Sequence, residues 1–294
     1  MVSQLITGFA TGAGYALVAI GIVLIYRCTK VLSIAQGEIG ALGFLFGLRW
    51  ADRGIPGIGA HPPLFGTLVI AMVIGAGLGL GIERFVMRPL VRRPPLDALI
   101  ASLGIALFLA LLEKEIFGTA TQNAPSPVGA WKVHVFGSTL VGPRIVGVVL
   151  TAAAAVAVYL FFTRTKFGLA VQATTGDPTV ARLLGVPVNQ VYRFAWAAGG
   201  ALSGLAASLL GPIFGGLAPF DMTRFALSAL AGAVIGGLDS IEGAIAGCLV
   251  IGMLEGVVRG QVGTPGASDL AVLLLVLATL IVRPRGFLGA AGAA

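Results

Sequence analysis

SQLITGFATGAGYALVAIGIVLIY, residues 3–26, contains no charged side chain. A transmembrane helix needs about 20 apolar residues, so this stretch is long enough to span a bilayer. Further uncharged runs lie at 62–82, 98–112, 145–163 and 194–220. Only 11% of the residues are charged, whereas soluble domains average roughly 25%. Because so few polar residues cannot cover a soluble core, the sequence predicts an all-α polytopic membrane protein.

The C-terminal third is less regular than the rest of the chain. Its uncharged runs cover only 225–238, 243–254 and 270–282. At about 1.5 Å of rise per residue, such runs are shorter than the roughly 30 Å apolar core of a bilayer. Short apolar segments interrupted by glycine are typical of broken or re-entrant helices. We therefore expect one transmembrane domain over 1–294, with about eight or nine spanning helices, some of them short or broken.

Basic residues orient the chain, because short cytoplasmic loops are enriched in Lys and Arg. They follow the first, second and last of these runs and mark the segment 164–190, lying within it or just after it: Arg27, Lys30, Arg84, Arg88, Arg92, Arg93, Arg164, Lys166, Arg182, Arg193, Arg283 and Arg285. With these inside, 49–63 and an external loop at 118–142 lie outside, as does the N-terminus, and the C-terminus lies inside. The external side balances its charges through Glu113, Glu115, Lys132 and Arg144.

Two other features of the chain follow from its charge and its first run. The first run lacks a basic leader, so we expect a retained helix rather than a cleaved signal peptide. The net charge of +7 is explained by the loops, and we expect no nucleic-acid partner.

A compact polar segment, TKFGLAVQATTGDPTVARLLGVPVNQ at 165–190, lies between two uncharged runs. Asp177 is a good N-cap, and Pro178 suits the first helical position, where its missing N–H is not needed. Val180, Leu183 and Leu184 then follow at i, i+3 and i+4, which predicts one apolar stripe on a short helix.

The same segment carries a strong helix stop. Gly185 suits the C′ position, Val186 supplies the following hydrophobic contact, and Pro187 prevents continuation. A helix this short is marginal in water, so we expect its stripe to be docked. Two interpretations are open. The helix lies on its own membrane domain or in the lipid interface, or it docks against a cytoplasmic partner.

A second candidate site is SIAQGE at 33–38. Glu38 lies inside an apolar stretch, and an intramembrane carboxylate indicates function by default. Gln36, Gly37 and Glu38 would then line the inner gate of a translocation path. The alternative is structural: Ser33 and Gln36 have capping-box spacing, so the second helix could simply begin here, near the cytoplasmic interface.

A third candidate is the stretch GGLDSIEGA, which separates two short apolar runs. Asp239 and Glu242 could contact a solute or an ATPase at a helix break, but the interpretation we favour is a solvated cytoplasmic turn. Glycines spaced by four, which permit close helix packing, occur at Gly8/Gly12, Gly77/Gly81, Gly200/Gly204 and Gly243/Gly247.

Several ordered stretches resemble branched-chain amino-acid ABC transporter permeases of the Liv type. GLAVQATTGDPTVARLLGV (168–186) looks like their cytoplasmic coupling segment, and GYALVAIGIVLIYRCTKVLSIAQGEIGALG (14–43) is similar to their first two helices. RPLVRRPPLDALIASLGIALFL (88–109) resembles their third loop and fourth helix. IGGLDSIEGAIAGCLVIGMLEG (235–256) and RPRGFLG (283–289) resemble their C-terminal elements. The likeness covers nearly the whole chain and is greatest to the LivH-type subunit.

The resemblance implies the permease subunit of an ATP-driven importer in a bacterial cytoplasmic membrane, carrying branched-chain amino acids. It implies a second homologous permease in a heterodimer, two cytoplasmic ATPase subunits, an external solute-binding protein and surrounding membrane lipid. The coupling segment 164–190 would dock on an ATPase through Gly168, Asp177, Pro178, Val180, Ala181, Arg182, Leu183, Leu184 and Gly185.

The cofactors implied belong to other subunits. No Walker A motif occurs in this chain, so ATP and Mg would bind to the ATPase partners. Neither HExxH nor GxSxG is present, and Cys28 and Cys248 lie far apart, so we expect no cofactor, metal or disulfide in this chain.

The sequence departs from the family pattern at four positions. Family members usually carry arginine where this chain has Leu169 and Gln172, alanine in place of Val180, and often histidine in place of Gln36. The coupling segment is therefore less basic than usual, and urea, short amides or another small polar solute remain alternatives to branched-chain amino acids.

Two other classes of protein compete with this interpretation. A secondary transporter or channel would need ionisable residues deep in several helices, and Glu38 is the one fair candidate. A membrane-embedded enzyme would need paired acids or a nucleophile with its base, which the sequence does not offer.

Overall fold

The structure is a computed structural model that describes residues 2–54, 63–91, 93–123, 132–135, 138–176, 178–262, 264, 266–283 and 286–287. The statements below concern these residues. Within them, five helical stretches are long and apolar enough to cross a membrane: Gln4–Thr29, Phe65–Leu90, Pro95–Phe117, Val188–Phe214 and Ile241–Gln261. Shorter apolar helices occur at Ile145–Phe161 and Ala267–Val282. The all-α polytopic class predicted from the sequence is confirmed.

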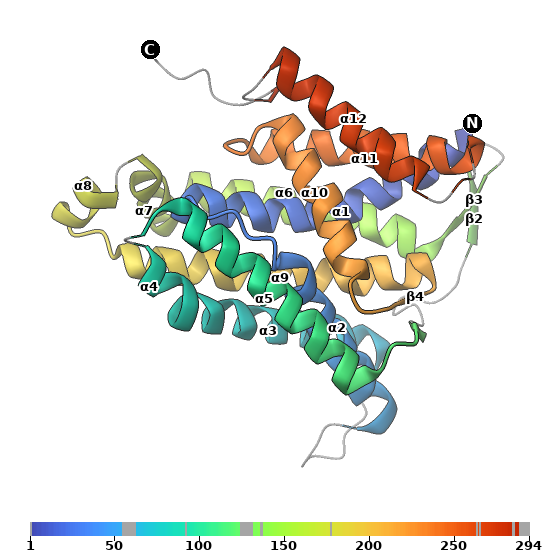
Figure 1. Cartoon of the computed structure of the whole chain (residues 1–294), viewed down its shortest axis with the longest axis horizontal. Helices are drawn as coiled ribbons and strands as arrows, with labels where there is room; N and C mark the ends of the chain where they lie inside the picture. Colours follow the sequence, from blue (N-terminus) through green and yellow to red (C-terminus); the bar gives the residue numbers. More distant parts are fainter. Residues whose placement is uncertain are drawn as a thin grey trace.

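Most of the long helices run along the long axis of the molecule, which has two distinct ends (Figure 1). One end carries α4 (Arg88–Leu90), α7 (Lys166–Gly176) and α8 (Pro178–Leu183). The other carries the N-terminus and two small antiparallel pairs: β1 (Gln122–Asn123) with β4 (Gly216–Leu217), and β2 (Lys132–Val135) with β3 (Ser138–Val141). Because β1 pairs with β4, the chain after α5 (Pro95–Phe117) meets the chain after α9 (Val188–Phe214) at this second end.

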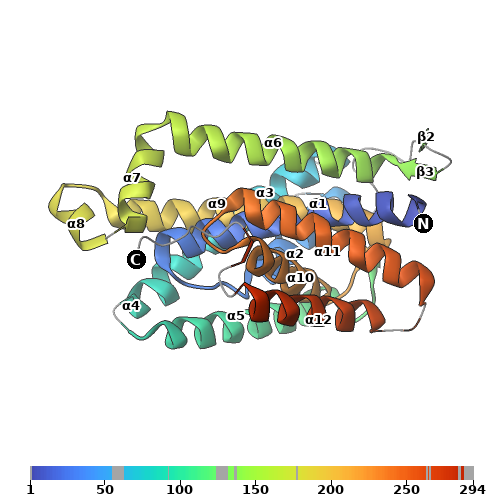
Figure 2. The ribbon, with the colours of Figure 1, turned by 90° about the horizontal axis from the view of Figure 1, so that it is seen from above.

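Helix α1 (Val2–Thr29) forms the centre of the bundle. Across its spanning part, 94% of the residues are buried, whereas only 28% are buried in α5. Figure 2 shows α1 and α9 between α6 (Gly142–Arg164) on one flank and α5 and α12 (Ala267–Val282) on the other. The flanking helices expose apolar side chains such as Ile100, Phe108 and Leu274, which suits a surface facing lipid or another subunit.

Glycine explains how closely the central helices approach one another. A methyl group at Gly200 of α9 would collide with the carbonyl oxygen of Gly75 in α3 (Leu64–Ile82). On α1, a methyl at Gly12 would lie 2.7 Å from the carbonyl oxygen of Cys248 in α11 (Ile241–Gln261). The pairs Gly8/Gly12 and Gly200/Gly204 named from the sequence are therefore packing sites, and Gly247 of a third pair packs as closely, on the Gly232 carbonyl. Gly77 and Gly81 are not, since nothing lies within 4 Å of an added Cβ at either residue.

Helix α2 (Gln36–Arg53) begins inside the bundle (Figure 1). α1 ends at Thr29, and the connecting chain runs back among the helices, where the hydroxyl of Ser102 accepts from the Ile34 N–H (3.3 Å) and donates to the Leu32 carbonyl (3.2 Å). Ser102 lies roughly 10 Å along α5 from its start, at 1.5 Å per residue. A start of α2 at the very end of the bundle is therefore not observed.

The capping box expected at the start of α2 is also absent. Ala35 is the N-cap residue, and no side chain bonds to the first backbone N–H groups. The Ser33 hydroxyl instead contacts the Gln36 side-chain oxygen at 3.4 Å.

The third loop begins later than the basic residues indicate. α3 continues through a π-helical turn, η1 (Glu83–Met87), into α4, so Arg84 and Arg88 are helical rather than loop residues. Arg88 pairs with buried Glu83 at 3.1 Å. The two residues are five apart, which is one π-helical repeat, and this spacing brings their side chains onto the same side of the helix.

The C-terminal third contains two short helices and one long one. α10 (Asp221–Gly236) and α12 each cover 16 residues, as short apolar runs predict. α11, however, covers 21 residues and continues through Glu255 and Arg259, where the uncharged run had ended. These two residues form an ion pair within the helix at 3.3 Å, so the charge does not end it.

Candidate functional site

The segment 164–190 folds as two short helices that project from one end of the bundle (Figure 1). α7 begins where the Thr165 hydroxyl accepts from the N–H of Gly168 at 2.8 Å. α8 follows directly, beginning at Pro178 as expected. Asp177, the expected N-cap, lies outside the described residues.

The stop signal of α8 forms as the sequence predicts. Gly185 has φ +81°, the left-handed conformation that glycine adopts most easily. Its N–H donates to the Arg182 carbonyl at 3.0 Å, and the N–H of Val186 donates to the Ala181 carbonyl at 2.9 Å. These two bonds make a Schellman motif, which satisfies the last carbonyls of the helix.

The predicted apolar stripe of α8 faces outward. Leu183 and Leu184 are 83% and 76% exposed, and Val180 is 49% exposed, whereas Ala181 is buried against the chain's own core. The interpretation that this stripe packs on its own membrane domain is therefore wrong. An exposed pair of leucines on a rigidly capped helix is the kind of surface that a partner or a lipid interface covers.

A basic hollow lies beside this helix. Two adjoining cavities of about 450 and 440 Å³ share Arg88, Arg182 and Asn189 in their lining, and Arg193 adds a further positive charge. Two parts of the chain far apart in sequence, the end of α3–α4 and the region from α8 to the start of α9, therefore bring arginines to the same place, next to the exposed leucines.

The second predicted site, Gln36–Glu38, lies in the interior of the bundle. Gln36 and Glu38 are both fully buried. Glu38 accepts from the backbone N–H of Thr223 at 2.7 Å and also from the Thr223 hydroxyl. A methyl at Gly37 would collide with the Met222 carbonyl, so the first turn of α2 packs directly on the first turn of α10.

Sequence reasoning misplaced Glu113. It was counted among the balanced charges of the external side, but it is fully buried in α5. Its carboxyl group lies against that of Glu38, close enough for a hydrogen bond between the two side chains. The signal that could have identified it is its place directly after the uncharged run 98–112, inside the same helix.

Further buried polar atoms near α2 have no partner in the described part of the chain. The side-chain nitrogens of Gln36 and Trp196 and the hydroxyl of Ser203 belong to this group. Buried polar groups in native proteins are almost always hydrogen-bonded, to protein or to water. The region where α2 packs against α5 and α9 is therefore a polar part of the bundle interior.

The third predicted site is an exposed turn. Asp239 forms a 3.4 Å ion pair with Lys30, which follows α1, and both side chains are more than half exposed. Ser240 caps α11 by accepting from the Gly243 N–H at 3.0 Å, and it also donates to Glu242 at 3.3 Å. The geometry agrees with the solvated turn that the sequence favours.

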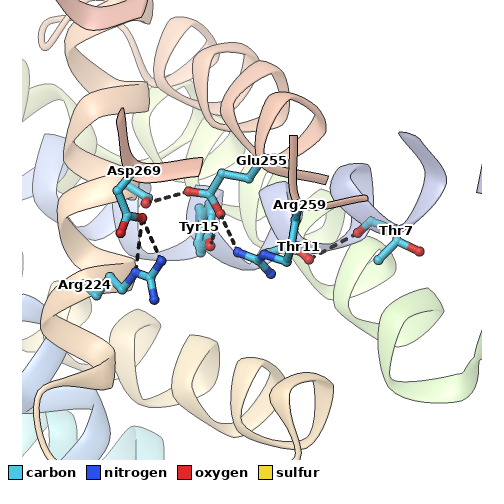
Figure 3. A network of polar contacts seen from close by, with 8 residues as sticks. Thr7, Thr11, Tyr15, Arg224, Glu255, Arg259 and Asp269 are labelled. Atoms are coloured by element: carbon cyan, nitrogen blue, oxygen red, sulfur yellow. Dashed lines mark hydrogen bonds and ion pairs between the residues drawn. The ribbon is translucent and has the colours of Figure 1, made fainter. Parts of the chain in front are cut away.

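A polar network that the sequence analysis did not identify links α1, α10 and α11 (Figure 3). Buried Glu255 accepts from the hydroxyls of Tyr15 and Ser228, each at 2.8 Å, and pairs with Arg259. The signal that could have indicated this network is the spacing of Glu255 and Arg259, four residues apart directly after an apolar run. Arg224, at the start of α10, forms a separate exposed ion pair with Asp269 at 2.8 Å.

The sequence model of the family described as "Branched-chain amino acid transport system / permease component" matches residues 4–282. The chain belongs to this family. It is accordingly a permease subunit of an ABC importer. Among the described residues, no group of His, Cys, Asp and Glu could hold a metal ion.

Relatives of this permease match over almost their full length. The chain is 30% identical over 292 residues to the high-affinity branched-chain amino acid transport system permease protein LivH of Escherichia coli (strain K12), covering 97% of this chain and 94% of that protein. It is 28% identical to BraD, the corresponding permease protein of Pseudomonas aeruginosa, covering 97% and 95%.

A solved structure has a similar fold. PsaBC from Streptococcus pneumoniae, in complex with Fab, matches with a TM-score of 0.52 and 16% sequence identity. The match covers 96% of this permease and 91% of that chain. At this identity the likeness concerns the fold alone.

Proposed function

We propose that this permease carries branched-chain amino acids across a bacterial cytoplasmic membrane, as the LivH-type half of a permease heterodimer. An external solute-binding protein delivers the solute, and two cytoplasmic ATPase subunits supply the energy. Support for the solute comes from the named activity of LivH and BraD, which resemble this chain from end to end.

The observation that carries the coupling part of the proposal is the exposure of Leu183 and Leu184 on α8. Two large apolar side chains on a projecting helix gain free energy when a partner covers them. The arginine-lined hollow beside them favours a partner surface with acidic side chains. We infer that α8 docks in a groove of an ATPase subunit, which binds ATP and Mg, and transmits its motion through α7 to the bundle.

The proposed orientation places α8 in the cytoplasm and the N-terminus outside. Arg88, Arg182 and Arg193 line one end of the bundle, and α1, which Lys30 follows in the chain, ends toward the same end (Figure 1). An end rich in basic residues is expected on the cytoplasmic side. The strand pairs and the loop at 118–142 then face outward.

The experiment is reconstitution of the permease with its neighbours. Tagged permease should co-purify with ATPase subunits, and vesicles containing the complex and its binding protein should take up leucine, isoleucine and valine when ATP is supplied. Uptake of urea or a short amide in place of these amino acids would refute the proposed solute and leave the coupling proposal standing.

A secondary transporter is the second candidate function, and one observation favours it. Glu38 and Glu113 are buried together without a cation among the described residues, as in carriers that couple transport to ions. Vesicles distinguish the two mechanisms, because a secondary transporter takes up solute under an imposed ion gradient without ATP or ATPase subunits.

A further inference from the structure

A small polar pocket lies between α1 and α11, near the end of the bundle that carries the N-terminus. It has a volume of about 220 Å³, smaller than the roughly 300–1,000 Å³ of pockets for drug-sized ligands, so it suits only a small chemical group. Two helix faces line it: Gln4, Thr7, Gly8 and Thr11 from α1, and Gly252, Glu255, Gly256, Arg259 and Gly260 from α11. No large apolar side chain is among them.

Because of its glycines, the pocket is lined in part by main-chain atoms. A methyl at Gly256 would lie 2.5 Å from the Gln4 carbonyl oxygen, and a methyl at Gly252 would collide with Gly8 and Gly12. α1 and α11 therefore touch through their main chains, and polar side chains at the edge of this contact border the pocket.

Arg259 brings a positive charge with unused donors to this pocket. Its side chain is about half exposed, and its one hydrogen bond runs from Nη2 to Glu255 at 3.3 Å. Within the described chain, Nε and Nη1 have no hydrogen-bond partner. The guanidinium also lies over the Phe214 ring, 5.5 Å from its centroid, which limits its orientation.

Glu255 positions this arginine through a single hydrogen bond, which leaves its other N–H donors available. The hydroxyls of Tyr15 and Ser228 already hold the buried carboxylate, so the guanidinium is tethered at one corner (Figure 3). Thr7 and Thr11 precede Tyr15 along α1 and border the same space. A planar guanidinium with a free edge is well suited to bind a carboxylate in a bidentate manner.

Gln4 supplies a hydrogen-bond acceptor, whereas Arg259 supplies donors. Its side-chain oxygen is buried and has no hydrogen-bond partner among the described residues. The pocket thus combines free cationic donors with an unpaired acceptor. The head group of an amino acid, with its carboxylate and ammonium, has the complementary pair of charges.

We propose that this pocket is a head-group site for zwitterionic amino acids, in which Arg259 binds the carboxylate and the Gln4 oxygen accepts from the ammonium. The proposal rests on the proposed function and on its orientation, which places the pocket at the outer end. Because no bulky apolar residue lines the pocket, it recognises the part that all amino acids share and not the side chain.

The test is direct binding of radiolabelled leucine to the permease–ATPase complex in nanodiscs, without the binding protein. In the wild type, valine and isoleucine should compete for the site. Leucinamide, which lacks the carboxylate, and 4-methylpentanoate, which lacks the ammonium, should compete poorly. Arg259→Gln should raise the Kd for leucine roughly ten- to hundredfold, the effect of losing a hydrogen-bonded charge pair.

Two further variants separate recognition from folding. Arg259→Lys keeps the charge but loses the planar fork, so its loss of affinity should be smaller than that of Arg259→Gln. Gln4→Met should weaken leucine binding and leave the weak binding of 4-methylpentanoate unchanged. Lys30→Gln is the matched control, because it removes a cation from an exposed ion pair at the opposite end of the bundle, and its Kd should equal that of the wild type.

The outcomes distinguish this proposal from the proposed function. An unchanged Kd in Arg259→Gln, or no leucine binding by a wild-type complex that still imports leucine, refutes the head-group site alone. A wild-type complex that neither binds nor imports leucine refutes the proposed solute, and the head-group site with it.

Discussion

The carboxylate of Glu38 accepts a 2.7 Å hydrogen bond from the backbone N–H of Thr223, 185 residues further along the chain. This bond joins the first turn of α2 to the first turn of α10 inside the bundle. A helix that begins inside a membrane protein exposes its first N–H groups there, and such starts are found at the solute sites of transporters. Substitution of Glu38 therefore tests whether this part of the bundle interior takes part in transport.

Glu38→Gln should reduce uptake roughly tenfold or more while expression and assembly stay normal. Gln retains an oxygen that can accept from Thr223, so the contact between α2 and α10 survives, but the negative charge is lost. The measurement is ATP-driven uptake per unit of purified complex. Uptake equal to that of the wild type would reduce Glu38 to a structural link between the two helices.

Leu183→Asp and Leu184→Asp should each detach the ATPase subunits. Both side chains are exposed in the isolated permease, so its free energy of unfolding should change by no more than about 0.5 kcal/mol. In the complex, the same change buries an unpaired charge at the docking surface. Pull-down of ATPase subunits and substrate-stimulated ATP hydrolysis are the readouts.

Thr179→Ala, on an exposed position of the same helix, is the control and should leave both readouts intact. If the two aspartate variants also retain their ATPases, α8 is only a surface helix.

Gly185→Ala should loosen α8 without affecting the membrane helices. The left-handed conformation at φ +81° costs roughly 1–2 kcal/mol for a residue with a Cβ, and the Schellman bonds depend on that conformation. Hydrogen exchange of the amides at 185 and 186 should accelerate. Gly176→Ala, with nothing within 4 Å of the added Cβ, should not accelerate exchange at these two amides; equal acceleration in both variants would contradict the local explanation.

Gly200→Ala should destabilise the bundle, whereas Gly77→Ala should not. An added methyl at Gly200 collides with the Gly75 carbonyl across the α3–α9 contact, and forced overpacking costs typically 1–3 kcal/mol. At Gly77 the methyl meets open space. Thermal unfolding of the two purified variants should differ accordingly, and equal stability would show that the α3–α9 contact is looser than described.

Cysteines introduced at 169 and 183 should resist an impermeant thiol reagent added outside intact cells, while cysteines at 121 and 123 should react. All four positions are exposed, so access depends on the side of the membrane. The native Cys28 and Cys248 are buried and should give little background. Labelling of 169 and 183 from outside would invert the proposed topology.

The sequence alone determined what local chemistry controls. Long uncharged runs predicted the spanning helices, because a bilayer core excludes charge over a known length. Pro178 at the start and Gly185–Val186 at the end predicted α8 closely, since caps depend on residues only a few positions apart. The family resemblance came from the same ordered stretches.

Only the tertiary structure decided the relations between distant segments. It showed that Glu113 meets Glu38, that Glu255 draws in Tyr15 and Ser228, and that α2 begins inside the bundle. The sequence could not indicate these contacts, because a glycine or a carboxylate has the same local pattern whether it packs on a helix or faces open space. The depth and rotation at which each helix meets its neighbours decide between the two.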